Sequence, residues 1–151
     1  MSIDHAAVAL VEEIVNGLRV RGRRLIPHPR GPGGASLAEI QGTVANRVEV
    51  VITGLPEDDG MSGRSHRRKT LRGAVEVRYT RGRTDRRDLE RTLLAAAEAL
   101  GDALGDPNNW KFHRSGVDLI LPEQAETDFD GEDDTSGLIL RVPFSLRYYP
   151  R

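Results

Sequence analysis

The chain has 151 residues, the usual length of one domain, and 38% of them are hydrophobic and 30% charged. It contains no Cys, which excludes disulfides, Cys-ligated zinc, iron–sulfur clusters and thiol nucleophiles. No apolar run approaches the roughly 20 residues of a membrane span. The first ten residues lack the basic start of a signal peptide, so we expect the protein to be in the cytoplasm. From its length and hydropathy we expect one domain over residues 1–151 that does not enter a membrane.

The net charge of −1 conceals an uneven distribution along the chain. Residues 19–91 carry 17 Lys and Arg against 9 Asp and Glu, whereas residues 92–151 carry 5 against 11. One explanation is a middle segment that binds nucleic acid. The other is a dipolar subunit that docks on copies of itself or on another charged partner, and both stay open because Arg suits protein interfaces as well as phosphates.

Two segments have the apolar period of a helix. Residues 4–20 form one apolar stripe, with Asp4 as the expected N-cap and Gly22 as the expected stop. Residues 85–104 form a stronger stripe, which Thr84 or Asp85 can cap and which Gly105 and Pro107 should end. Trp110 and Phe112 follow this helix and are expected to cover the end of the core.

Four segments alternate between apolar and polar residues, as half-buried strands do. They are residues 47–53, 71–80, 117–121 and 138–149. Pro143 cannot donate to a ladder, which predicts an edge or a bulge in the last strand. Flexible loops are expected at about 23–46, 55–70 and 122–137. The sequence therefore predicts an α+β domain of order α-β-β-α-β-β: an antiparallel four-stranded sheet of two long-tipped hairpins, with two helices on its apolar face.

The familiar motifs of enzymes and metal sites fail when tested residue by residue. The glycines at 31–34 are not followed by the Lys of a phosphate-binding loop. A calcium loop starting at Asp128 would need Gly at its sixth position and Glu at its twelfth, which here are Asp133 and Ile139. The four His residues lie in no nucleophile motif. We therefore expect no catalytic residues, no cofactor and no metal.

Two loop tips are the candidate interaction sites. The basic tip consists of Arg64, Arg67, Arg68 and Lys69, which could contact phosphates without reading sequence, although it lacks aromatic residues for base stacking. The acidic tip, residues 126–134, could dock on a basic surface, with Phe129 as apolar anchor and the acids steering approach. Its residues proposed for contact are Asp128, Phe129, Asp130, Asp133 and Asp134. For both tips, a merely solvated loop is the plainer alternative.

The order of these elements resembles the tail terminator (tail-completion) proteins of long-tailed bacteriophages, the lambda-like minor tail protein U group. The resemblance is carried by AAVALVEEIVNGL, the strand pair RVEVVITG and LRGAVEVRYT, the helix DRRDLERTLLAAAEAL and the closing stretch DFDGEDDTSGLILRVPFSLRYYP. It covers nearly the whole chain. Residues 27–34, rich in Pro and Gly, and the basic tip depart from the family pattern.

The resemblance implies a structural protein of the virion tail or neck, assembled in the host cytoplasm. Such a protein forms a homo-oligomeric ring, usually a hexamer, on the head-proximal end of the tail tube. The ring stops polymerisation of the tail tube protein, presents a surface to the head–tail connector and lets DNA pass through its lumen. Another neck or head–tail joining subunit, a basic module for non-specific nucleic-acid binding and a small enzyme are the alternatives.

Overall fold

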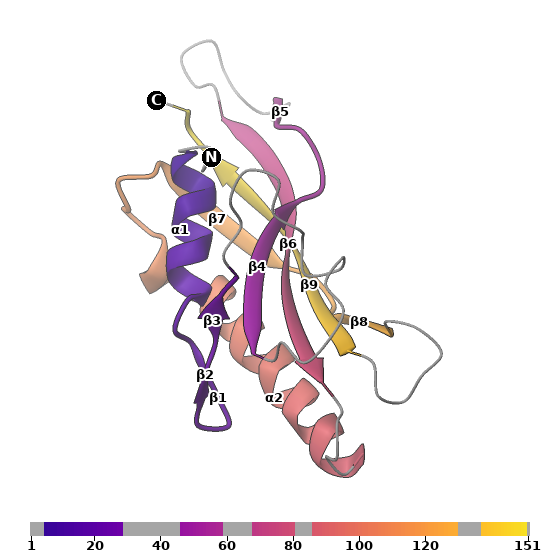
Figure 1. Ribbon diagram of the computed structural model, residues 1–151. Helices are drawn as coiled ribbons and strands as arrows, with labels where there is room; N and C mark the ends of the chain where they lie inside the picture. The colour runs from indigo at the N-terminus through magenta and orange to yellow at the C-terminus, as the bar shows by residue number, and fades with distance from the viewer. Residues whose placement is uncertain (1–4, 29–45, 59–67, 81–85, 130–136, 151) are drawn as a thin grey trace.

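The computed structural model describes residues 5–28, 46–58, 68–80, 86–129 and 137–150 (Figure 1). It contains helices α1 (Ala6–Val15) and α2 (Arg86–Gly105) and a short 3-10 helix, η2 (Pro107–Asn109). The strands are β1 (Arg19–Val20), β2 (Arg23–Arg24), β3 (Ile26–Pro27), β4 (Arg47–Ile52), β5 (Glu57–Asp58), β6 (Lys69–Thr80), β7 (Val117–Pro122), β8 (Glu126–Phe129) and β9 (Gly137–Tyr148).

The predicted four-stranded antiparallel sheet is wrong. The main sheet is mixed and has seven strands: β3-β4-β6-β9-β7 in order, with β5 on β6 and β8 on β9. β3 runs parallel to β4, the other pairs are antiparallel, and β1 with β2 forms a separate two-stranded sheet. The order α-β-β-α-β-β therefore describes only the longer elements. The additional strands have two to four residues, which is too short for alternation to reveal them.

Four of these short strands occupy segments in which loops were expected. β2 and β3 lie within 23–46, β5 within 55–70 and β8 within 122–137. Each forms only because a neighbouring strand offers backbone groups to pair with, as β9 does for β8. Most other residues of the three expected loops lie outside the described part of the chain.

One face of the sheet and both helices share the hydrophobic core. The long strands β6 and β9 lie side by side in a register that sets Val77 opposite Leu140 and Val75 opposite Val142. All four side chains are buried in one cluster that includes Val11 of α1 and the α2 residues Ala96, Leu100 and Leu104. The expected placement of the apolar stripes against an apolar sheet face is confirmed.

The first helix is shorter than the pattern predicts. It ends at Val15, where Asn16 turns extended and Gly17 takes a φ of +80°, the left-handed conformation that commonly ends helices. The N-cap of α1 is His5, and the expected cap, Asp4, lies outside the described residues. Thr84 and Asp85, the expected caps of the second helix, also lie outside them. Gly22 is not the stop: it has a φ of +80° in the turn between β1 and β2.

Pro143 lies in the middle of β9, and the expected irregularity lies beside it: residues 123–125, between β7 and β8, stand opposite residues 142–143, one residue more on their side than on β9. Its carbonyl oxygen accepts from the Glu123 amide at 2.7 Å, on the side of β9 that carries β7 and β8. Residues 123–125 interrupt pairing between those two strands. Because N–H and C=O of one residue point the same way in an antiparallel ladder, the missing Pro143 donor faces this interruption.

Candidate interaction surfaces

The basic tip is only partly within the described chain, because Arg64 and Arg67 lie outside it. Arg68 is half-buried, and its Nη2 lies 3.2 Å from Asp118 Oδ2. Lys69 begins β6, where its Nζ lies 3.8 Å from Asp58 Oδ1. These two cations are thus engaged with acids of the same fold.

The acidic tip also extends beyond the described residues, which exclude Asp130, Asp133 and Asp134. Asp128 and Phe129 are the last residues of β8, and their backbones pair with Ile139 and Leu138 of β9. The start of the expected loop is therefore a strand that belongs to the main sheet.

The two predicted sites are not brought together. Lys69 pairs with Tyr148 at one end of β9, and Phe129 pairs with Leu138 near the other. Ten residues of extended strand separate these partners, a distance of about 33 Å at the usual rise per residue. A single ligand that touches both sites must span the length of the sheet.

A second basic surface, which sequence reasoning missed, is the hairpin of β1 and β2. Its six residues, 19–24, include four Arg: Arg19, Arg21, Arg23 and Arg24, all exposed. Arg19 lies directly opposite Arg24 in the ladder. The four Arg are visible in the sequence, but two-residue strands show no period, and the segment is divided between the expected helix over 4–20 and the expected loop over 23–46. We call these six residues the basic hairpin.

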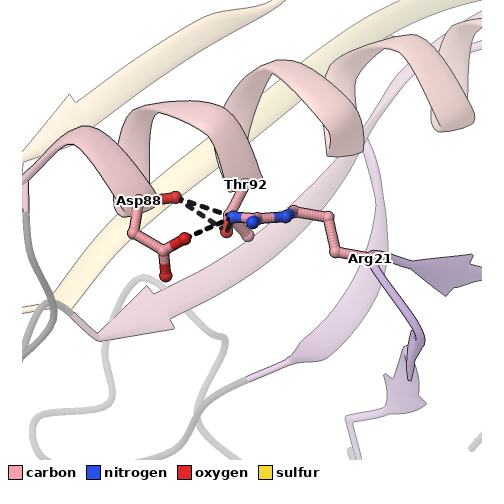
Figure 2. Close-up of polar contacts among 3 residues, drawn as sticks. All are labelled: Arg21, Asp88 and Thr92. Carbon is pink, nitrogen blue, oxygen red and sulfur yellow. Dashed lines mark hydrogen bonds and ion pairs between the residues drawn. The ribbon is translucent and has the colours of Figure 1, made fainter.

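Arg21 fastens the basic hairpin to helix α2 (Figure 2). Its Nη1 donates to Asp88 Oδ1 at 2.7 Å, to the Asp88 carbonyl oxygen at 3.2 Å and to Thr92 Oγ1 at 3.1 Å. Arg21 has a φ of 50°, so a non-glycine residue holds the left-handed conformation at the turn. The hairpin tip is therefore fixed against the helix, while its other three Arg side chains stay exposed.

A row of charged residues crosses the face of the sheet that is opposite the core cluster. Glu49, Glu76, Arg141 and Glu126 stand side by side on β4, β6, β9 and β8. Arg141 binds Glu76 Oε2 through Nε at 2.7 Å and through Nη2 at 2.6 Å. Glu49, Glu76 and the neighbouring Arg78 are buried, so this part of the polar face is not solvated, although alternation in β6 predicted a solvated face there.

Two tyrosines on the core face have altered acidity. Burial raises the pKa of Tyr79 to about 12, because the phenolate would lose its hydration. Burial also raises the pKa of Tyr148, whose ring meets His5 edge-on with centroids 4.9 Å apart. Among the described residues the Tyr79 hydroxyl has no hydrogen-bond partner. Its position amid apolar side chains indicates packing rather than chemistry.

The connection after α2 places its two aromatic residues differently. Trp110 is buried against the core, as expected, but Phe112 is 94% exposed and has a φ of +61°. Phe112 therefore does not cover the core, and Lys111 Nζ lies 5.3 Å from its ring centroid. The sequence could not distinguish them, because they are two residues apart in an irregular turn.

Within the described ranges, no three His, Asp or Glu residues gather as ligands for a metal ion. The helices that the structure describes are too short or too polar to span a membrane. No protein-family model matches the chain, and no curated protein matches it either.

Proposed function

We propose that this protein is a ring-forming assembly subunit that caps the head-proximal end of a phage tail tube. The motif resemblance supports the proposal, and the sheet supplies the structural observation that carries it. One side of the sheet ends in β3, added parallel to β4, whereas the other ends in β7 and β8, which follow one another along β9.

Two unlike edges favour head-to-tail contact, in which one copy's patch meets a different patch on the next copy. Such contacts close into a ring when the rotation between copies fits. The number six comes from the family resemblance alone. In this role the protein acts in the virion neck, ends growth of the tube and offers its outer surface to the connector. A related head–tail joining subunit is the nearest alternative.

The experiment is to add purified protein to tail tube protein while tubes polymerise, and to measure tube length by electron microscopy. Capping predicts shorter tubes that carry a ring at one end. An unrelated protein of equal size is the control. Tubes of unchanged length without a terminal ring would contradict the proposal. A ring on the connector alone would favour the joining subunit.

Non-specific binding of nucleic acid is the second candidate, because the basic hairpin exposes four Arg. Electrostatic binding of DNA weakens steeply with salt. A labelled DNA duplex should then bind the free protein, with affinity that falls linearly in log salt. If the duplex does not bind even at low salt, this candidate is excluded.

A further inference from the structure

The two sides of the sheet carry charge of opposite sign. The basic hairpin leads through Leu25 directly into β3, at one side of the sheet, and β8 lies beyond β9 at the other side (Figure 1). On the acidic side, Glu123 and Glu126 are exposed. The chain thus has a basic side and an acidic side.

The basic hairpin has more positive charge than its own fold neutralises. Arg19 and Arg24 stand directly opposite each other, and like charges in that position are destabilising. Within the described part of the chain, Arg19, Arg23 and Arg24 make no side-chain hydrogen bond or ion pair, whereas Arg21 is held by Asp88. The hairpin is therefore held in place by Arg21, and its other three Arg can bind acidic groups of a partner.

Glu126 on the acidic side is left unmatched for a reason that the register shows. Its cross-strand neighbour on β9 is Arg141, the cation that would ordinarily neutralise it. Arg141 instead directs both Nε and Nη2 to Glu76 on β6. No other described residue forms an ion pair with Glu126.

We propose that the basic hairpin of one copy receives the β8 side of the next copy, with Arg19 and Arg24 facing Glu123 and Glu126. This inference rests on the proposed ring and names the contact that would build it. A second copy is favoured over nucleic acid because the matching acids belong to the same chain, on the opposite side of the same sheet. Complementary patches of this kind steer encounter and fix register.

The test uses two charge-reversal variants of the whole chain: Arg19→Glu with Arg24→Glu, and Glu123→Lys with Glu126→Lys. Self-association is measured by sedimentation velocity at about 0.1 M salt, where charges act over about 10 Å, and at about 1 M, where they act over about 3 Å. Wild type should associate at the lower salt and dissociate at the higher. Each variant alone should associate at least about tenfold more weakly.

An equimolar mixture of the two variants should recover association. The first keeps the native acidic side and the second the native hairpin, so those surfaces still fit. The altered surfaces are again opposite in charge. Matched controls are Arg72→Glu with Arg114→Glu and Glu98→Lys with Asp102→Lys, which make equal charge changes at exposed positions elsewhere. Both controls should behave as wild type, and circular dichroism should show every variant folded.

Wild type that stays monomeric at the lower salt, variants that associate normally, or a mixture that does not recover would each overturn the inference. Loss of affinity for a labelled DNA duplex in the hairpin variant, with self-association unchanged, would reassign the hairpin to nucleic acid. The tube-length assay, applied to both charge-reversal variants, distinguishes a wrong interface from a wrong proposed function. Capping that survives both reversals keeps the ring and removes this interface.

Discussion

Trp110 donates through Nε1 to the carbonyl oxygen of Leu104, at 3.0 Å, and so completes the end of helix α2. The Asn109 side chain does the same for the Ala103 carbonyl, at 2.8 Å. The last carbonyls of a helix have no partner within it, and both of these are satisfied by side chains from the turn that follows. The buried indole therefore links the end of the helix to the core.

Trp110→Phe should destabilise the fold by about 1–3 kcal/mol, because it keeps an aromatic ring but leaves the Leu104 carbonyl without its donor. The free energy of unfolding should be measured by urea denaturation followed by circular dichroism. The matched control is Phe112→Ala, since Phe112 is 94% exposed and should change stability by less than about 0.5 kcal/mol. Equal losses in the two variants would contradict the assigned role of Trp110.

Gly73→Ala should be destabilising by about 1–3 kcal/mol, as overpacking is. A Cβ there would lie 2.7 Å from the Val51 carbonyl oxygen and 2.8 Å from Phe144 Cζ, and the backbone atom cannot move aside easily. Gly101→Ala is the control: its Cβ meets nothing within 4 Å, and Ala in a helix gains about 0.5–1 kcal/mol over Gly. The two substitutions should therefore shift the thermal midpoint in opposite directions.

Tyr79→Phe should leave stability unchanged or raise it at neutral pH, because the buried hydroxyl has no partner in the described chain. The pKa of Tyr79 can be tested by measuring the free energy of unfolding at alkaline pH. The phenol ionises near pH 10 when unfolded and near 12 when folded, so the unfolded state loses its proton first. The free energy of unfolding should then fall as pH rises from about 10 towards 12.

Tyr79→Phe should reduce that alkaline fall, and Tyr148 should account for part of what remains, since burial raises its pKa as well. A Tyr79→Phe variant with an unaltered alkaline limb would show that Tyr79 is not the group responsible.

The ion pair of Arg21 with Asp88 should contribute modestly to stability, because both side chains are about half exposed. A double-mutant cycle with Arg21→Gln and Asp88→Asn should give a coupling of about 0.5–1 kcal/mol that shrinks at high salt. The local effect should be larger than the global one. Hydrogen exchange in residues 19–24 should accelerate in either variant, whereas exchange in β6 should not change.

The candidate sites could be predicted only in part. Runs of like charge at 64–69 and 126–134 are visible in any reading of the sequence, and the described residues among them were placed by the fold in unexpected ways. Arg68 contacts Asp118, far away in the chain, and Asp128 belongs to a strand. Charge is a property of the residue, but its availability depends on neighbours that the sequence does not show. The basic hairpin was missed because its two-residue strands show no period in the sequence.

By itself, the sequence determined the long elements: the β6 and β9 alternation, the apolar stripe of α2 and the shared core face. These follow from contiguous residues, since period 2 or 3.6 is written locally. Tertiary structure alone decided that β9 is an interior strand, that β3, β5 and β8 exist, and that Glu76 and Arg78 are buried. A two-residue strand has too few side chains to show a period and forms only where a partner's backbone is exposed, and burial of a charge depends on what packs over it.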